Sequence, residues 1–452
     1  MMRRILMILL AIGLNTIGMT AQKSAMEVVN AMSPGWNLGN TFEASSGQGA
    51  LFNNKAGLNA ETSWQGTKTT PELIDFVKAQ GFRSVRIPCA WVLGHISDAT
   101  QYTIDKDWMA RVKKVVDYCI KADLYVVLND HWDGGWLEEH IADTDQAKMA
   151  KNKEVLKAVW TQIAEAFKDY DQRLIFAGLN EPNTEDSPKA TTIDNLLAYE
   201  QVFIDAVRAV GGKNSDRVLV VQGPSTNIDK TVKYASKFLG LNDSAKNLLA
   251  IEVHYYNPWQ FWGMEKDESW GRVFYYWGKA NHLNGSQHNA TWGEEDTMKE
   301  QLMAMKTNFV DKGMPVVIGE FGANWRNLSA LKSEDQAKHD ASIRFHYYEL
   351  HRLCKELGGM VPMTWDINYT NQGGVKGVMT LIDRKNLKIY CKPAMEGIIE
   401  AYGKSSGVST ARIANPENKG IYNLRGQLVA DDLSTSLPSG IYVYQNEKLT
   451  IK

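Results

Sequence analysis

Short apolar runs recur along the chain, and each is followed by a stretch in which apolar residues have helical spacing. The runs lack the polar alternation of half-exposed strands, which is typical of strands buried on both faces of a parallel sheet. Eight such runs occur, at 35–40, 84–90, 125–131, 175–182, 218–223, 249–256, 315–322 and 359–366. Eight strand–helix alternations predict an α/β protein with a (β/α)8 TIM barrel.

The segments between the runs carry helix signals. Thr70 is suited to cap a helix that has Pro71 at its first position, and Gly81 is suited to end it. A second helix is expected over 107–121. A doubly wound sheet is the alternative, but the first run is not followed by the G-x-G-x-x-G phosphate loop of such folds. The barrel is therefore favoured.

The two ends of the chain differ from the rest. Residues 1–21 predict a signal peptide, because two arginines precede an apolar run that ends in small residues. That run is shorter than the roughly 20 residues that span a bilayer. We expect a catalytic domain over 22–403, a small polar linker over 404–418 and a β-rich tail over 419–452. The protein is accordingly predicted to be secreted or held at the cell surface, without a transmembrane span.

Composition narrows the function classes. Among 452 residues, 50 basic and 52 acidic side chains give a formal net charge of -2, which argues against a nucleic-acid-binding protein. The nine histidines form no H-x-H or H-E-x-x-H motif, so neither a metal nor another cofactor is expected. Four scattered cysteines, Cys89, Cys119, Cys354 and Cys391, are expected to be free, buried thiols. The protein is expected to be a monomer.

Polar and aromatic side chains end seven of the eight predicted strands. In a barrel of this kind, the C-terminal ends of the strands carry the chemistry. Packing alone does not explain so many polar residues at the ends of apolar runs. The residues are Asn40, Arg86, His131, Asn180, Glu181, His254, Tyr256, Glu320 and Trp365.

Two carboxylates in this set suit glycoside hydrolysis. Glu181 and Glu320 follow the fourth and seventh runs, which face each other across a closed eight-stranded barrel. Hydrolysis with retention needs two carboxyl groups about 5–5.5 Å apart, so we predict Glu181 as acid/base and Glu320 as nucleophile. Arg86 is expected to keep Glu320 ionised, and Tyr256 to donate a hydrogen bond to it. Asn180 is expected to contact the sugar 2-hydroxyl.

Further residues are expected to line or support a sugar-binding cleft. His131 and His254 are predicted hydrogen-bond donors near the sugar, and Asn37 is placed among the supporting residues. The chain has 14 tryptophans, whose indole faces can stack on flat sugar rings. The predicted stacking platforms are Trp36, Trp64, Trp132, Trp259 and Trp365.

The motifs resemble glycoside hydrolase family 5, the cellulase family, over about residues 30 to 400. The matching stretches are GWNLGNTFEA (35–44), VRIPCAW (85–91), GLNEPN (178–183), HYYNPWQF (254–261), IGEFGA (318–323) and MTWD (363–366). The resemblance implies Glu181 as acid/base and Glu320 as nucleophile. It also implies that the sugar on the glycone side of the cleavage point is lined by Arg86, His131, Asn180, His254, Tyr256 and Trp365.

Within that family, ETSWQG (61–66) and the first motif are similar to a subgroup of endoglucanases that includes xyloglucanases. The subgroup usually carries two adjacent histidines after the third strand, whereas here Trp132 follows His131. The tail, with LPSGIY (437–442), resembles the sorting tail of the Bacteroidetes type IX secretion route, which implies the secretion machinery as a partner.

These features predict a retaining endo-β-1,4-glucanase acting on cellulose-like, mixed-linkage or xyloglucan polysaccharides. A xyloglucan-specific enzyme, a β-mannanase and a transglycosylase on the same scaffold remain alternatives, because they would share the catalytic residues. A carbohydrate-binding protein with an inactive barrel would lack one of the two carboxylates, and both are present.

Overall fold

The computed structural model of the protein describes residues 22–328, 333–370 and 374–403, together with four strands further on. The predicted signal peptide (1–21) and linker (404–418) lie outside the described residues. The described residues up to Ala401 belong to one compact unit, and those from Tyr402 onward belong to a second.

Eight parallel strands close into a barrel in which each strand lies beside its neighbours in sequence and the last pairs with the first. The barrel prediction is confirmed, and every predicted run overlaps one strand of the barrel. The strands are β1 (Gly35–Asn37), β2 (Ser84–Ile87), β5 (Tyr125–Asn129), β6 (Leu174–Ala177), β7 (Leu219–Gln222), β8 (Leu249–Tyr255), β9 (Val316–Phe321) and β10 (Met360–Thr364).

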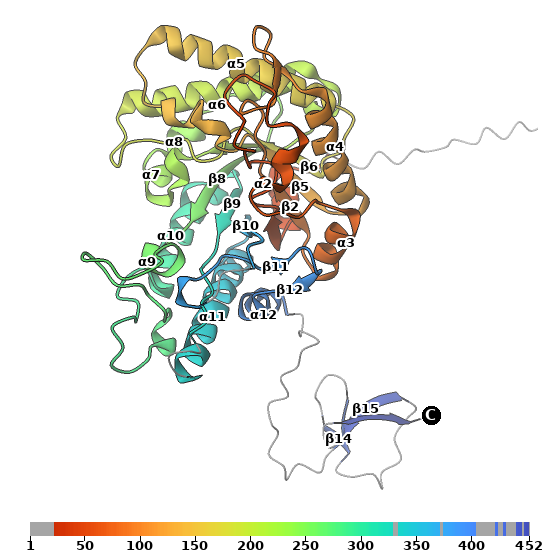
Figure 1. The fold of residues 1–452 in the computed structure, drawn as a ribbon, viewed down its shortest axis with the longest axis vertical. Helices are drawn as coiled ribbons and strands as arrows, with labels where there is room; N and C mark the ends of the chain where they lie inside the picture. The colour runs from red at the N-terminus through yellow and green to blue at the C-terminus, as the bar shows by residue number, and fades with distance from the viewer. Residues whose placement is uncertain are drawn as a thin grey trace, which may run out of the picture. The chain divides into compact units, whose positions relative to one another are not determined.

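Helices surround the strands (Figure 1). The longer ones are α3 (Pro71–Ala79), α4 (Lys106–Lys121), α5 (Gln146–Ala166), α6 (Ala190–Val210), α10 (Glu295–Asn308), α11 (Ser333–Leu357) and α12 (Lys392–Ala401). The shorter ones are α1 (Ala25–Ala31), α2 (Ala60–Ser63), α7 (Ile228–Lys233), α8 (Ala235–Phe238) and α9 (Trp259–Trp262). Two strand pairs lie outside the barrel, β3 (Ile96–Asp98) with β4 (Thr103–Ile104), and β11 (Ile382–Asp383) with β12 (Lys388–Ile389).

Helix α3 begins as its sequence predicts. The Thr70 side chain accepts a hydrogen bond from the backbone of Leu73, and Pro71 occupies the first helical position. Gly81, just beyond the helix, has a φ of 101°, a conformation that favours glycine. The buried side of the helix carries Leu73, Ile74 and Val77, so local signals and packing agree.

Helix α1 closes one end of the barrel. Its Ser24 cap and Glu27 form a reciprocal capping box. Val28 and Val29 pack into one buried cluster with strand residues such as Val317 and Val361. Since this apolar plug fills the N-terminal end of the barrel, the C-terminal ends of the strands are left to form the functional face.

All four cysteines are buried free thiols, as expected. Within the described ranges, no helix combines the length and apolar character needed to cross a membrane. In the second unit, an antiparallel sheet has the order β14-β13-β15-β16, which confirms that the tail is β-rich. Its strands are β13 (Ile421–Asn423), β14 (Leu428–Ala430), β15 (Gly440–Tyr444) and β16 (Glu447–Ile451).

Candidate active site

Two carboxylates meet at the C-terminal ends of β6 and β9, which are separated in the barrel by β7 and β8. Glu181 follows β6, and Glu320 lies near the end of β9. One carboxylate oxygen of each, with a ring nitrogen of His254, forms a group whose atoms all lie within 4.8 Å of one another. The Glu181 side chain is 46% exposed and that of Glu320 is 8% exposed. One carboxylate is therefore open to the cleft while the other is sunk in its floor.

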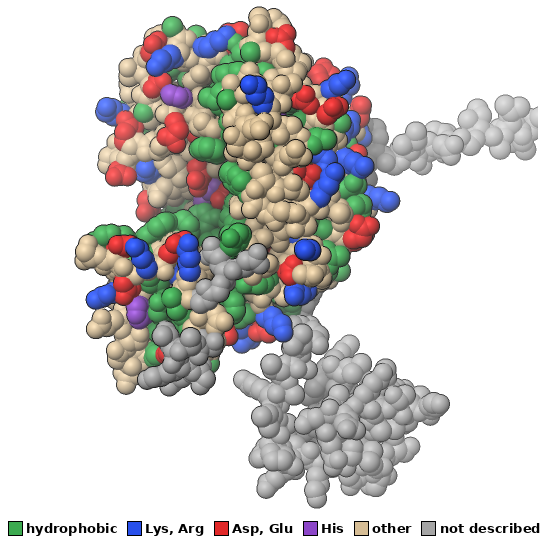
Figure 2. All heavy atoms as spheres, viewed as in Figure 1, with side chains coloured by type: hydrophobic (Ala, Val, Ile, Leu, Met, Phe, Trp, Pro, Cys, Tyr) green, Lys and Arg blue, Asp and Glu red, His purple; other side chains and the backbone are tan. Residues whose placement is uncertain are grey.

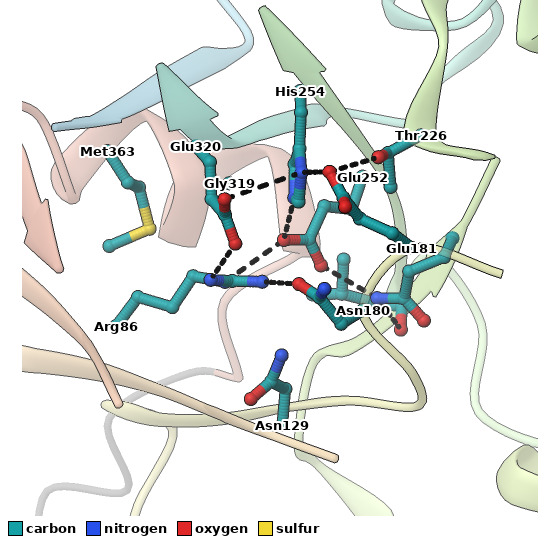
Figure 3. Close-up of polar contacts among 12 residues, drawn as sticks. Arg86, Asn129, Asn180, Glu181, Thr226, Glu252, His254, Gly319, Glu320 and Met363 are labelled. Atoms are coloured by element: carbon teal, nitrogen blue, oxygen red, sulfur yellow. Dashed lines mark hydrogen bonds and ion pairs between the residues drawn. The ribbon is translucent and has the colours of Figure 1, made fainter. Parts of the chain in front are cut away.

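Arg86 organises the floor of the site from β2 (Figure 3). Its fully buried guanidinium donates from Nη1 to Glu320 Oε1 at 2.9 Å and from Nη2 to Asn180 Oδ1 at 2.7 Å. Nη1 also donates to Asn37 Oδ1 at 3.1 Å, and Asn37 in turn donates to the carbonyl of Gly319. Asn37 is thus a support for Arg86, and the Asn180 amide oxygen is already engaged.

His254 links the two catalytic candidates. Its Nδ1 lies 2.7 Å from Glu181 Oε1 and 3.8 Å from Glu320 Oε2. Burial lowers the pKa of His254, but the Glu320 charge and the Glu181 hydrogen bond outweigh burial and raise it to about 10. Burial raises the pKa of Glu181, but the hydrogen bond and the charge of His254 lower it by more. The pKa of Glu181 therefore lies below its ordinary value. The proton shared by Glu181 and His254 therefore resides on His254.

Two hydrogen-bond donors, Arg86 and Tyr256, contact the Glu320 carboxylate besides the nearby His254. Burial raises the pKa of Glu320, and the positive charges of His254 and Arg86 oppose that rise. The Tyr256 hydroxyl donates to Glu320 Oε2 at 3.2 Å, as expected. Because a guanidinium stays charged and can only donate, the Arg86 contact favours the carboxylate form of Glu320.

His131 and Trp365 lie beside this group. Burial lowers the pKa of His131 well below its ordinary value, and the Arg86 charge adds to the effect, so the ring is neutral. The Asn129 amide nitrogen lies 3.2 Å from His131 Nδ1. Because an amide nitrogen can only donate, His131 Nδ1 accepts this hydrogen bond and His131 Nε2 carries the hydrogen. Nε2 is 3.9 Å from Glu320 Oε1, and the ring stacks on Trp365 with 5.7 Å between centroids.

A cleft of about 580 Å³ opens above the carboxylates. Figure 2 shows this face hollowed, with acidic and histidine side chains at the base and hydrophobic side chains along the hollow. The end of β9 and the loops after β6, β7, β8, β9 and β10 line it. The lining residues include Glu181, Thr226, Asn227, Tyr256, Trp259, Trp262, Glu320, Asn324 and Trp365. Of the predicted platforms, Trp259 and Trp365 face the cleft.

The other predicted platforms, Trp36, Trp64 and Trp132, are not among the residues that line this cleft. The expectation for Trp36 is wrong, because its ring is 0% exposed, donates to Asp366 at 2.9 Å and is covered by Arg384. A sealed indole has no face to offer a sugar. Trp64 and Trp132 are each 43% exposed but are not among the described residues that line the cleft.

Three residues of the site lack an individual sequence prediction. Trp262 lines the cleft and packs on Tyr256, with 4.4 Å between centroids; its spacing from Trp259 places both on one side of α9. Glu252 is a buried charge in an otherwise apolar run, a signal that could have found it. Glu138 accepts the backbone N–H groups of Asn180 and Glu181 at 2.9 and 2.8 Å, and no sequence pattern marks it.

The group Glu181, His254 and Glu320 is also where three metal-ligating atoms converge among the described residues. A cation there would compete with the His254 proton and would lie beside the Arg86 guanidinium. The donor set therefore suits proton transfer better than metal binding.

A closed (β/α)8 barrel with two carboxylates this close at its open end defines a glycoside hydrolase of the retaining type. The family model Cellulase (glycosyl hydrolase family 5) matches residues 45–371. The chain therefore belongs to glycosyl hydrolase family 5, the cellulase family.

Individual relatives agree with this membership. Endoglucanase A of Paenibacillus barcinonensis is 35% identical over 371 residues, 78% of this chain and 84% of that protein. A xyloglucan-specific endo-β-1,4-glucanase of Bacteroides ovatus is 35% identical over 354 residues, 77% of this chain and 66% of that protein.

Solved structures extend the comparison. A xyloglucan-specific β-1,4-glucanase from a ruminal metagenomic library, in complex with XXLG, is 44% identical with a TM-score of 0.75, over 85% of this chain and 97% of that one. A lichenase from Caldicellulosiruptor sp. F32, in complex with cellotetraose, is 29% identical with a TM-score of 0.69, over 84% and 96% of the two chains.

Proposed function

We propose that this protein is a retaining endo-β-1,4-glucanase, with Glu320 as nucleophile and Glu181 as acid/base. The observation that carries the proposal is the approach of the two carboxylates to within 4.8 Å at the base of an open cleft. Inverting enzymes separate their carboxyl groups by about 6.5–9.5 Å to admit a water molecule, and this pair leaves no such room.

The reaction has two balanced steps. Glu320 forms a bond to the anomeric carbon while the glycosidic bond breaks and its oxygen takes a proton from Glu181. Glu181 then removes a proton from water, whose oxygen attacks the anomeric carbon and releases Glu320. The proton used in the first step is held in the His254–Glu181 pair, where it moves along the 2.7 Å hydrogen bond.

The neighbouring groups prepare these steps. Arg86 and Tyr256 bind different oxygens of Glu320, which orients the carboxylate and leaves it unable to rotate freely. The Asn180 amide oxygen is held by Arg86, so its amide nitrogen is the group that remains to donate to the sugar 2-hydroxyl.

For the substrate, we propose β-1,4-glucan backbones, with xyloglucan and mixed-linkage glucan accepted and mannan used poorly. The half-exposed Glu181 and the aromatic rings of Trp259, Trp262 and Trp365 suit a long, flat chain bound across an open surface. The xyloglucanase and lichenase relatives support this range. The axial 2-hydroxyl of mannose would meet Asn180, and a site that hydrogen-bonds a hydroxyl discriminates against its misplacement.

Two measurements test the proposal. Proton NMR of the first-formed product should show the β-anomer, whereas an initial α-anomer would contradict retention. Values of kcat/KM on xyloglucan, barley glucan, carboxymethylcellulose, glucomannan, galactomannan and xylan should be highest for the glucans. A preference for galactomannan or xylan would overturn the substrate assignment and leave the mechanism intact.

We further propose that the protein is exported, that residues 1–21 are removed, and that the tail at 419–452 is recognised by the secretion machinery. The charged start and apolar run of the N-terminal sequence support this proposal. Amino-terminal sequencing of the enzyme from cells and medium tests it. A mature chain beginning near Gln22 is expected, and an enzyme that keeps Met1 inside the cell would contradict it.

A further inference from the structure

One buried carboxylate, that of Glu252, contacts both Arg86 and His254. Glu252 lies on β8, two residues before His254, and its side chain is 0% exposed. Its Oε1 is 3.0 Å from Arg86 Nε and 3.4 Å from His254 Nε2, and its Oε2 accepts from Gln222 Nε2 at 2.7 Å. Arg86 and His254 thus each contact a second carboxylate, through nitrogen atoms other than those that contact Glu320 and Glu181 (Figure 3).

The neighbouring strand leaves room for this carboxylate. A Cβ atom placed on Gly319 would lie 1.7 Å from Glu252 Oε1, so any other residue before the nucleophile Glu320 would collide with it. The pairing of β8 with β9 also shifts register between Val253 and His254, next to the same position. The requirement for glycine here is evidence, independent of the hydrogen bonds, that the barrel is built around Glu252.

The charges around Glu252 keep it ionised. Burial raises the pKa of Glu252, but the Arg86 charge and the His254 hydrogen bond outweigh burial and bring it below its ordinary value. The other ionisable groups that face this network are Glu181, Glu320, His131, Tyr256 and, on α6, Glu200. A fixed negative charge at Nε2 favours the protonated form of His254 and so opposes loss of the shared proton to solvent.

We propose that Glu252 is a positioning residue that holds Arg86 and His254 in place and retains, on the His254–Glu181 pair, the proton that the glycosidic oxygen receives. The inference rests on the proposed role of Glu181 as acid/base. Glu252 itself does not reach the cleft, because Arg86 and His254 lie between it and the carboxylates that face the sugar.

The variant Glu252→Gln tests the inference, with Glu200→Gln as a matched control. Glu200 is equally buried and accepts the backbone N–H of Gln222, but burial raises its pKa well above the ordinary value, so the carboxyl is neutral. In Glu252→Gln, the basic limb of kcat/KM against pH on soluble β-glucan should move to lower pH by about one unit or more. In Glu200→Gln the limb should stay in place.

A leaving-group comparison adds a second readout. Glu252→Gln should slow polysaccharide cleavage at least about 10-fold more than formation of the glycosyl–enzyme from an aryl cellobioside with an acidic phenol, because that phenol leaves without a proton. A folded Glu252→Gln enzyme with the wild-type basic limb would overturn the proposal. Equal slowing of both substrates would do the same, since it would indicate a structural role alone.

Two further measurements apply if Glu252→Gln does not fold. Glu252→Asp keeps the charge, so its basic limb should match the wild type even where kcat is reduced. Nitrogen-15 NMR of the histidine-labelled wild-type protein should show a His254 cation at neutral pH, and a neutral ring would overturn the proposal. Failure of the acid/base assignment itself would be seen separately, in Glu181→Gln.

Discussion

Glu138 Oε1 accepts the backbone N–H of Glu181 at 2.8 Å, so a buried carboxyl group holds the main chain from which the acid/base projects. The same oxygen accepts the N–H of Asn180 at 2.9 Å. Glu138 is 5% exposed and belongs to the loop after β5, whereas the two N–H groups belong to the loop after β6. The position of Glu181 therefore depends on a contact between neighbouring loops.

Glu138→Ala should lower kcat/KM by about 10- to 100-fold, because it removes the acceptor of two N–H groups that fix the main chain at Glu181. The N–H of Asn180 is buried, and leaving it unpaired costs about 1–3 kcal/mol. Glu138→Gln keeps an acceptor oxygen of the same reach and should retain most activity. Steady-state kinetics on soluble β-glucan, with circular dichroism to establish folding, would measure both. Equal losses in the two variants would contradict a role as backbone acceptor.

The stability of Glu138→Gln relative to the wild type should depend on pH. Burial raises the pKa of Glu138 from 4.5 to about 8. Between these two pH values the folded protein keeps a proton on Glu138, whereas the unfolded chain releases it. The wild type therefore loses stability as pH rises between these two values. Glu138→Gln cannot ionise and should gain Tm relative to the wild type from about pH 5 to about pH 8.5. A Tm difference that is constant with pH would contradict the raised pKa.

Glu320→Gln should reduce kcat by roughly 10⁴-fold or more on every substrate, because no covalent intermediate can form. The loss should be equally large on aryl cellobiosides, since the nucleophile is needed whatever the leaving group. Mass spectrometry after incubation with a 2-fluoro glycoside should show a labelled wild-type protein and an unlabelled variant. Substantial turnover by a folded variant would remove Glu320 as the nucleophile.

Glu181→Gln should have a different signature. Polysaccharide cleavage should fall by about 10²- to 10⁴-fold, as general acid catalysis is lost. An aryl cellobioside with an acidic phenol should still give a burst of phenol, followed by slow turnover that azide accelerates, because azide needs no general base. Similar losses on both substrates, without azide rescue, would contradict the acid/base assignment.

Trp259→Ala should weaken polysaccharide binding. The ring is 44% exposed and lines the cleft, so truncation should cost about 1–2 kcal/mol, or roughly 5- to 30-fold in kcat/KM. Trp270, which is 66% exposed and is not among the described cleft-lining residues, provides the control, and Trp270→Ala should be near neutral. Equal effects of the two substitutions would argue against a stacking role for Trp259.

The local features of the chain are the ones that its sequence determines. Eight buried strands follow from continuous apolar runs, and α3 begins at a cap formed by residues adjacent in sequence. The positions of Glu181 and Glu320 could be predicted because parallel strands in a barrel end at the same face, so residues that follow them must converge. His254, Tyr256 and Arg86 come together for the same reason.

Contacts between distant parts of the chain determine which side chains are sealed, which face the cleft and which hold the others in place. Trp36 and Trp259 are equally plausible as stacking platforms from the sequence. In the structure, Asp366 and Arg384 cover Trp36, whereas Trp259 lines the cleft. Glu138 contacts the backbone of Glu181, which is 43 residues away in the chain. Glu252 contacts both His254, 2 residues away, and Arg86, 166 residues away. Burial and pairing depend on atoms that folding brings together, and hydrophobic periodicity records only which side of one element is buried.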